Sequence, residues 1–323
     1  MKIKFDSSLD YQKQAIKSIT DIFQGQEICE ANFTVYSPEF LDKQQNLTFN
    51  ELGYGNRLTL TEGSIVKNVQ NIQLANGLKP SNRNEIDRNK LDFTIEMETG
   101  TGKTYVYLRT IMELYRQYGF TKHIIVVPSI PIKEGVYKSL QITETHFKQL
   151  YDNVNYNYFI YDSGKLNEVR DFSTNDGLSI MVINIDAFRK SFQNPNDTKK
   201  KANIIHRYND KLGYKPLDLI NNTNPIVFID EPQSTMSTPL AKKAVQSLSP
   251  LAIIRYSATH KEKINLMYKL DAVDAYEKKL VKQIEVASLQ TEGMHNQAYI
   301  HLLDVRSRGG NIEARIEVDA LVR

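Results

Sequence analysis

The sequence has very little cysteine and no long hydrophobic run. Cys29 is the only cysteine among the 323 residues, so no disulfide can form within the chain, as is usual for proteins of a reducing compartment. No segment has the length and apolarity of a membrane-spanning helix, and the first five residues, MKIKF, lack the apolar centre of a signal peptide. We therefore expect a cytoplasmic protein with no membrane partner.

A large excess of charge of one sign is also lacking. The 41 Lys and Arg residues against 38 Asp and Glu give a formal net charge of +3. A net charge this small neither requires nor excludes a nucleic acid as partner, so any basic surface must be local. Hydrophobic residues make up 41% of the chain, which is enough to bury one large core or two smaller ones.

The most informative stretch that is present is the glycine-rich motif ETGTGKT at Glu98–Thr104. It follows residues 91–97, in which apolar side chains alternate as a strand requires. It precedes residues 105–118, where apolar side chains recur at helical spacing and Gly119 is placed to end the helix. A strand, a glycine-rich turn and a helix in this order predict a phosphate-binding loop.

Each residue type in this motif has a physical role in binding phosphate. Glycines allow backbone N–H groups to close around phosphate oxygens, and the helix N-terminus adds a positive dipole. Lys103 would reach the β- and γ-phosphates, and the Thr104 hydroxyl would ligate Mg²⁺. The strict pattern has a glycine where this chain has Met97. The predicted nucleotide-binding residues of the loop are Thr99, Gly100, Thr101, Gly102, Lys103 and Thr104.

A second motif, Asp230-Glu231, follows the apolar residues 226–229. Nucleotide hydrolysis needs a carboxylate that holds Mg²⁺ and a group that orients the attacking water. We assign the first role to Asp230 and the second to Glu231. The predicted catalytic residues are therefore Glu231, Asp230 and Lys103, and the predicted metal ligands are Thr104 and Asp230.

Four hydrophobic runs after the loop predict buried parallel strands, because they are apolar on both faces. They lie at residues 124–127, 179–183, 226–229 and 251–254. Helical patterns lie between them, so we predict a doubly wound α/β fold with a mostly parallel sheet and helices on both faces. Functional residues gather past the carboxyl ends of such strands. The polar residues at these positions include Ser129, Asn184, Asp230, Glu231, Ser257 and Thr259.

The chain before the phosphate loop begins with an amphipathic helix predicted at residues 9–23. Gln12 stands at its start, and a carboxamide can both donate to and accept from the edge of an adenine base. Residues 24–90 are polar and weakly periodic, and we interpret them as an insertion or a small subdomain. Within them we predict a short strand at residues 59–61 and a helix at residues 65–78.

Three regions follow from these patterns. Residues 1–90 hold the first helix and the insertion, and residues 91–260 form the nucleotide-binding domain. Residues 261–323 would be the truncated start of a following segment. In this last region we predict a helix at residues 268–280 and strands at residues 297–323.

These motifs resemble those of the superfamily 2 helicases and translocases. ETGTGKT at residues 98–104, DEPQ at residues 230–233 and SAT at residues 257–259 look like motifs I, II and III, and Tyr11-Gln12 resembles the adenine-contacting glutamine motif. A narrower resemblance is to the Res subunit of type III restriction enzymes. The stretches that carry it are Met97, DEPQ, VPSIPIKEGV at residues 127–136, YSATH at residues 256–260 and LDAVDAY at residues 270–276.

The resemblance implies a RecA-like P-loop motor domain that uses ATP and Mg²⁺ and acts on double-stranded DNA. It implies that Ser129, Lys133 and Asn184 contact a nucleic-acid backbone, and that Ser257 and Thr259 link the carboxylate pair to DNA. For the complete enzyme it implies a methyltransferase (Mod) subunit as partner and a C-terminal nuclease domain. Since neither a second motor domain nor nuclease residues are found in this sequence, we expect the ATP-binding front part of a larger restriction enzyme.

Two other functions remain open at this point. One is an RNA helicase or a DNA-repair helicase of superfamily 2, although the DEPQ box and the insertion favour restriction. The other is a nucleotide-gated module that binds nucleic acid without moving along it. ATP hydrolysis stimulated by DNA would distinguish a motor from such a module.

Overall fold

The computed structural model describes residues 5–28, 30–35, 51–88, 90–195, 197, 199–209, 214–282, 299–308 and 311–319. The chain divides into two compact units, Met1–Val281 and Lys282–Arg323. Cys29 and the outer ends of the last predicted strands, residues 297–298 and 320–323, lie outside the described residues.

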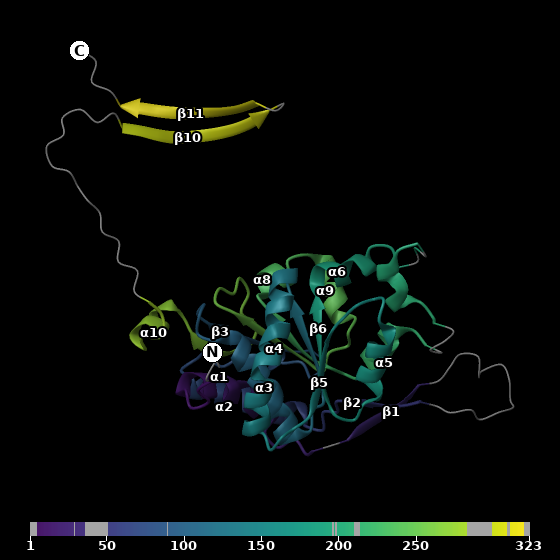
Figure 1. The fold of residues 1–323 in the computed structure, drawn as a ribbon. Coiled ribbons are helices and arrows are strands. Elements are labelled where there is room, and N and C mark those ends of the chain that lie inside the picture. The colour runs from purple at the N-terminus through teal and green to yellow at the C-terminus, as the bar shows by residue number, and fades with distance from the viewer. Residues whose placement is uncertain are drawn as a thin grey trace, which may run out of the picture. The chain divides into compact units, whose positions relative to one another are not determined.

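Over the described residues, the first unit contains a seven-stranded sheet in which every pair of neighbours is parallel (Figure 1). The strand order is β5-β6-β4-β7-β8-β3-β9. The strands are β3 (Leu91–Met97), β4 (Lys122–Val127), β5 (Tyr156–Ile160), β6 (Leu178–Asn184), β7 (Ile226–Asp230), β8 (Ala252–Ser257) and β9 (Leu266–Leu270). The predicted α/β class is confirmed, and the four hydrophobic runs are β4, β6, β7 and β8.

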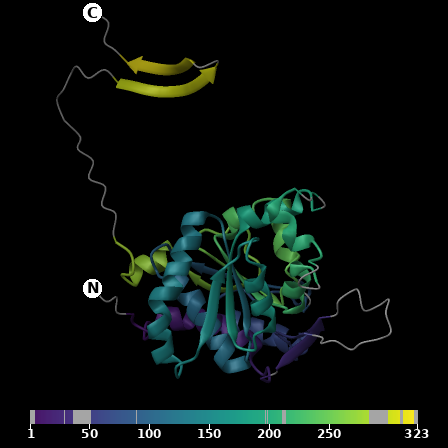
Figure 2. The same ribbon diagram turned by 45° about the vertical axis from the view of Figure 1, so that its right-hand side comes forward.

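The strands are apolar on both sides because two helical layers cover the sheet. Along β4, Ile125 and Val127 belong to one core cluster, whereas Ile124 and Val126 belong to the other. The first cluster packs against α1 (Asp10–Thr20), α2 (Glu62–Ala75), α3 (Lys103–Tyr118) and α4 (Ile130–Leu150). The second packs against α5 (Leu166–Thr174), α6 (Ile185–Arg189), α7 (Pro216–Asn222) and α9 (Pro239–Gln246). Figure 2 shows the strands between these layers.

The segment before the sheet is more structured than its polar sequence indicates. The helix predicted at residues 9–23 is α1, extended by the 3₁₀ turn η1 (Asp21–Phe23). An antiparallel pair, β1 (Ala31–Val35) and β2 (Glu51–Gly55), was not predicted; α2 and η3 (Arg83–Glu85) follow it. The strand predicted at residues 59–61 is wrong, because Thr61 is the N-cap of α2 and its hydroxyl accepts a hydrogen bond from the Ser64 N–H at 3.2 Å.

The helix predicted at residues 268–280 is wrong over its first residues. Residues 266–270 form β9, an outer strand that pairs with β3, and the shorter helix α10 (Ala272–Glu277) follows. Two side chains at the end of α2 bond to β9: the Gln73 amide donates to the Leu266 carbonyl at 3.1 Å, and the amide of the C-cap residue Asn76 donates to the Met267 carbonyl at 2.6 Å. The sheet therefore continues past residue 260, where the sequence indicated a boundary.

The remaining elements are short connections and the second unit. The connections η4 (Lys190–Phe192), η5 (Lys201–His206) and α8 (Pro232–Thr235) belong to the first unit. The second unit contains the antiparallel strands β10 (Tyr299–Arg308) and β11 (Asn311–Asp319), as predicted for the described part of residues 297–323. None of the described helices is both long enough and apolar enough to cross a membrane.

Candidate active site

The phosphate-loop motif joins β3 to α3, as the sequence predicts. Gly100 and Gly102 have φ angles of +84° and +89°, in the left-handed region where a side chain is strained. A Cβ atom at Gly102 would also lie 2.9 Å from Gln12 Nε2. Both glycines are therefore required by the backbone path of the loop.

The N-terminus of α3 is left open toward the loop. Gly102 is its N-cap, and among the described residues no side chain caps it. The first N–H groups of a helix have no partner within the helix, so they are available to an anion. The Thr101 hydroxyl donates to the Glu98 carbonyl at 2.6 Å, and this hydrogen bond holds the loop in its turn.

The first helix reaches this loop through Tyr11 and Gln12. The Tyr11 hydroxyl donates to the Thr101 carbonyl at 3.0 Å, and the Gln12 amide donates to the same oxygen at 3.3 Å. The other end of the Gln12 carboxamide, Oε1, is buried and has no hydrogen-bond partner in the described part of the chain. The structure thus places Gln12 beside the loop with an acceptor left unused.

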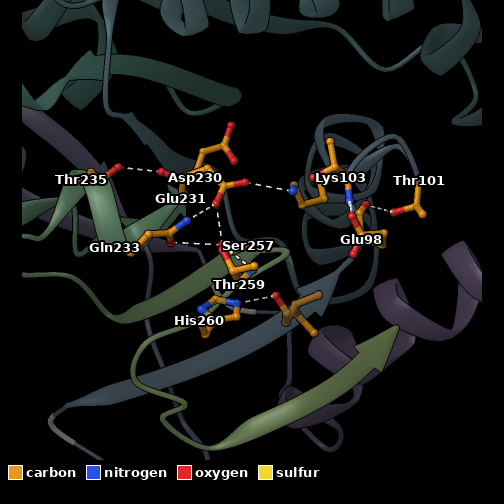
Figure 3. Close-up of polar contacts among 12 residues, drawn as sticks. Glu98, Thr101, Lys103, Asp230, Glu231, Gln233, Thr235, Ser257, Thr259 and His260 are labelled. Atoms are coloured by element: carbon orange, nitrogen blue, oxygen red, sulfur yellow. Dashed lines mark hydrogen bonds and ion pairs between the residues drawn. The ribbon is translucent and has the colours of Figure 1, made fainter. Parts of the chain in front are cut away.

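Figure 3 shows the contact that joins the two predicted motifs. Lys103 Nζ, at the start of α3, lies 2.9 Å from Glu231 Oε1, at the end of β7. The Glu231 backbone is left-handed, with φ of +50°, and it begins α8. Strand β8 lies between β3 and β7 in the sheet, so the loop and the carboxylate pair face each other across it.

The second carboxylate oxygen of Glu231 is held from the opposite side. Ser257 Oγ and Gln233 Nε2 each donate to Oε2 at 2.5 Å (Figure 3). Burial raises the pKa of Glu231, but the hydrogen bonds from Ser257, Lys103 and Gln233 outweigh burial and bring this pKa below its ordinary value. Glu231 is therefore a fixed, ionised carboxylate near neutral pH.

The pKa of the neighbouring carboxyl group, Asp230, is shifted in the opposite direction. Burial first, and the Glu231 charge second, raise the pKa of Asp230 to about 6, although Lys103 lowers it. Only 8% of Asp230 is exposed, and the Thr235 hydroxyl donates to its main-chain carbonyl at 2.6 Å. Two adjacent carboxyl groups with pKa values pushed apart are suited to different tasks.

The predicted nucleic-acid residues divide into two groups. Ser257 belongs to the Glu231 cluster, and the Thr259 N–H donates to Ser257 Oγ at 3.1 Å. Ser129 and Lys133 instead follow β4, and Asn184 is the last residue of β6, farther along the same edge of the sheet.

In this structure two residues of that second group have local partners. Lys133 Nζ pairs with Glu134 at 3.2 Å. Asn184 Oδ1 accepts the Asp186 N–H at 2.8 Å and so caps α6.

Sequence reasoning assigned no role to two residues of the quoted motifs. Gln233 contacts both Glu231 and Ser257, since its Oε1 lies 3.0 Å from Ser257 Oγ. The His260 ring makes a 2.9 Å hydrogen bond from Nε2 to the Ile95 carbonyl of β3. The available signal was that Gln233 ends the DEPQ motif and His260 ends the YSATH motif.

The residues present fit a nucleotide-bound magnesium ion. In the part of the chain that the structure describes, no group of three or more His, Cys, Asp or Glu residues could hold a metal by itself. Mg²⁺ usually keeps several waters and binds through one or two carboxylates together with the phosphates of a nucleotide. The Asp230 carboxylate and the Thr104 hydroxyl fit that limited set of protein ligands.

This arrangement defines the class of the protein. A parallel α/β sheet carries a phosphate loop after β3 and a carboxylate pair after β7, and Lys103 and Glu231 connect the two. These are the features of a RecA-like P-loop domain of the superfamily 2 helicase type. The family model described as "Type III restriction enzyme, res subunit" matches residues 7–262, and the chain belongs to this family.

Individual relatives agree with this assignment. The chain is 30% identical over 242 residues to the Res subunit of the type III enzyme EcoP15I of Escherichia coli, a match that covers 70% of this chain and 24% of the relative. It is 27% identical over 297 residues to the Res subunit of EcoPI of Escherichia phage P1, covering 87% of this chain and 28% of the relative. The chain thus spans about a quarter of the length of these relatives.

Solved structures resemble the chain only distantly. A nuclease-deletion mutant of the type ISP restriction-modification enzyme LlaGI, in complex with a DNA substrate mimic, is 13% identical with a TM-score of 0.39 and covers 67% of this chain and 20% of its own. The SWI2/SNF2 ATPase core of Sulfolobus solfataricus with double-stranded DNA is 14% identical with a TM-score of 0.33, covering 60% of this chain and 31% of its own.

Proposed function

We propose that this chain is the ATP-binding part of a DNA-dependent ATPase motor within a type III restriction enzyme. In the full enzyme, ATP hydrolysis would drive movement on double-stranded DNA and would be coupled, with a Mod subunit, to site-specific cleavage. The observation that supports this most directly is the 2.9 Å contact between Lys103 and Glu231. It brings a phosphate-binding cation and a candidate catalytic carboxylate into one site.

The roles follow from the chemistry of each group. Lys103 and the open N-terminus of α3 would bind the β- and γ-phosphates, and Thr104 and Asp230 would hold Mg²⁺, which neutralises charge on the phosphate oxygens when bound. Glu231 would orient the attacking water and accept its proton, a task that suits an ionised carboxylate. Gln12 Oε1, which is buried and has no partner among the described residues, would accept a hydrogen bond from the exocyclic amine of adenine.

Competition for Lys103 would place nucleotide binding before the binding of the attacking water. The phosphates and Glu231 compete for the same ammonium group, so a bound triphosphate draws Lys103 away from Glu231. Glu231 Oε1 then becomes free to bind the water, while Oε2 stays held by Ser257 and Gln233. The carboxylate is thereby oriented before the reaction begins, and preorganised groups of this kind contribute strongly to catalysis.

Hydrogen bonds connect the same carboxylate to a residue proposed to contact nucleic acid. Glu231 is bonded to Ser257, and Ser257 Oγ accepts the N–H of Thr259, which is exposed. We propose that Thr259 senses DNA and that Ser129, Lys133 and Asn184 contact its backbone farther along the sheet edge. Lys133 would then exchange Glu134 for a phosphate group.

The experiment that tests this proposal separates binding from chemistry at the carboxylate pair, in the full-length enzyme. Glu231→Gln keeps the size of the side chain, and its amide oxygen can still accept from Ser257 and Gln233, but the contact with Lys103 and the basicity of the carboxylate are lost. ATP affinity should stay nearly unchanged while DNA-stimulated hydrolysis falls by roughly 10²–10⁴, the usual contribution of a positioned base. Asp230→Ala should weaken both Mg²⁺-dependent nucleotide binding and hydrolysis.

Nucleotide binding by equilibrium titration and phosphate release with and without DNA are the measurements. Lys103→Ala serves as the control that loses binding. A Glu231→Gln enzyme that loses ATP binding but keeps its turnover per bound ATP would contradict the assigned roles. Intact enzyme that binds ATP but shows no hydrolysis stimulated by DNA would instead indicate a nucleotide-gated binding module.

A further inference from the structure

Tyr107 carries a buried hydroxyl that the chemistry above does not use. Tyr107 lies three residues after Thr104 on α3, so the two side chains share one face of the helix. Only 1% of Tyr107 is exposed, and within the described part of the chain no atom meets its hydroxyl in good hydrogen-bonding geometry. An unpaired buried polar group costs about 1–3 kcal/mol, so this hydroxyl calls for an explanation.

The sheet next to α3 places the ring at the level of the carboxylate pair. Phe228 and Asp230 are two positions apart on β7 and so face the same side, and Tyr256 of β8 is opposite Asp230 in the strand register. The Tyr107 ring lies 6.5 Å from the Phe228 ring and 5.6 Å from the Tyr256 ring. The phenol is therefore held between α3 and these two strands, on the face that Asp230 shares.

The groups that shift the pKa of Tyr107 are those expected near the carboxylate pair. Burial raises the pKa of Tyr107 well above its ordinary value, the Asp230 carboxylate raises it further, and the Thr104 side chain lowers it. Both residues act on the phenol because they are close to it. They are also the two side chains proposed to hold Mg²⁺.

We infer that Tyr107 is a positioning residue for the magnesium site, whose hydroxyl would bridge Asp230 and Thr104 when the ion is bound. This inference rests on the proposed function. A phenol has one proton to donate and can also accept one hydrogen bond. An ionised Asp230 can only accept, and a Thr104 hydroxyl that ligates a metal through its oxygen must give its proton to another acceptor.

Tyr107 meets both needs at once. It would donate to the carboxylate and accept from the threonine, so that both ligands keep lone pairs available for the ion. Hydrogen-bond partners behind metal ligands typically change metal affinity by about 10–100-fold when they are removed.

The test is Tyr107→Phe, which keeps the ring and removes only the hydroxyl. ADP binding is measured over a range of Mg²⁺ concentrations and also with the metal chelated, together with thermal unfolding. We expect the Mg²⁺ concentration needed for half of the metal-dependent binding to rise about 10–100-fold. Binding of ADP without metal should not change, and the unfolding temperature should stay the same or rise, because an unpaired buried hydroxyl has been removed.

Tyr256→Phe is a matched control. It also removes a hydroxyl from a fully buried ring on the same face of the sheet, but that hydroxyl lies 3.4 Å from Thr110 Oγ1 rather than beside the predicted metal ligands. Its Mg²⁺ requirement should equal that of the unmodified chain.

Three results would overturn the inference. The first is an unchanged Mg²⁺ requirement in Tyr107→Phe, and the second is an equal rise in Tyr256→Phe. The third is a lower unfolding temperature together with loss of metal-free binding, which would show a purely structural role. If the unmodified chain bound no nucleotide with or without Mg²⁺, the proposed function itself would fail, and that result is distinct from the other three.

Discussion

At the scale of single residues, Glu231 is held by its backbone as well as by its side chain. A non-glycine residue in the left-handed region costs about 1–2 kcal/mol, and Glu231 has φ of +50°. Its carbonyl accepts from the N–H groups of Ser234 and Thr235 at 2.9 and 3.0 Å, and its own N–H donates to the Tyr256 carbonyl at 2.9 Å. These bonds maintain the turn that directs the carboxylate toward Lys103.

His123 shows how a single buried group sets a pH dependence. It is fully buried on β4, and burial lowers its pKa from 6.5 to about 4, although the hydrogen bond with the Phe120 carbonyl opposes this. The folded state therefore keeps His123 neutral at a pH where the unfolded chain is protonated. Between about pH 6.5 and pH 4 the unfolded state binds more protons, so stability is lost as the pH falls through this window.

We expect His123→Phe to remove that part of the pH dependence. The difference in unfolding free energy between the variant and the unmodified chain should change by about 3 kcal/mol across the window, since one pKa unit corresponds to about 1.4 kcal/mol. Urea unfolding at several pH values between 4 and 8 measures it. The difference between the variant and the unmodified chain cancels the contribution of Asp230, whose raised pKa changes stability with pH in the opposite direction. A difference that stays constant with pH would show that His123 does not titrate in this way.

At the scale of elements, β9 is an outer strand whose free edge is covered by side chains rather than by another strand. Gln73 is the central contact: its amide donates to Ser81 Oγ at 2.8 Å and to the Leu266 carbonyl, and its Oε1 accepts the Ser81 N–H at 2.7 Å. It is 1% exposed. This residue therefore attaches α2 to the sheet edge next to the phosphate-loop strand.

We expect Gln73→Ala to lower the free energy of unfolding by about 2–4 kcal/mol. The Leu266 carbonyl and the Ser81 N–H each lose a partner, and because both bonds are only part-buried, each loss should cost about 1–2 kcal/mol, in the lower part of the usual range. Denaturant unfolding is the measurement. Asn71→Ala, at an exposed position of the same helix, should change stability by less than about 0.5 kcal/mol. Equal effects of the two substitutions would refute the role assigned to Gln73.

At the scale of the whole chain, the residues of the proposed site lie in one of the two compact units. Gln12, Lys103, Asp230 and Ser257 belong to Met1–Val281, and the β10–β11 pair belongs to Lys282–Arg323. Contacts cluster within each unit. Folding of the site should therefore not depend on the second unit.

We expect a chain ending at Val281 to keep the unfolding temperature of the first unit and its affinity for Mg²⁺-ADP within about twofold, because the complete seven-stranded sheet lies within Met1–Val281. Calorimetry and nucleotide titration of the shortened and full chains make the comparison. A shortened chain that aggregates, or that loses nucleotide affinity tenfold, would show that the second unit supports the first.

Local sequence patterns were sufficient for much of this protein. The phosphate loop, the helix that follows it and its stop at Gly119 all depend on residues close together in the sequence, as does the pair Asp230-Glu231. The four hydrophobic runs were recognisable because a strand covered on both faces must be apolar at nearly every position. These patterns also predicted the fold class.

Long-range contacts decided the rest. Residues 266–270 became a strand rather than a helix because β3, distant in the sequence, pairs with them and the amides of Gln73 and Asn76 donate to two of their carbonyls. Lys103 pairs with Glu231 only when α3 packs on β7 and β8. The same packing places Tyr107 on the face of the sheet that Asp230 shares. Periodicity records which face of an element is buried, but not which element covers it, and the chemistry of this site depends on that second fact.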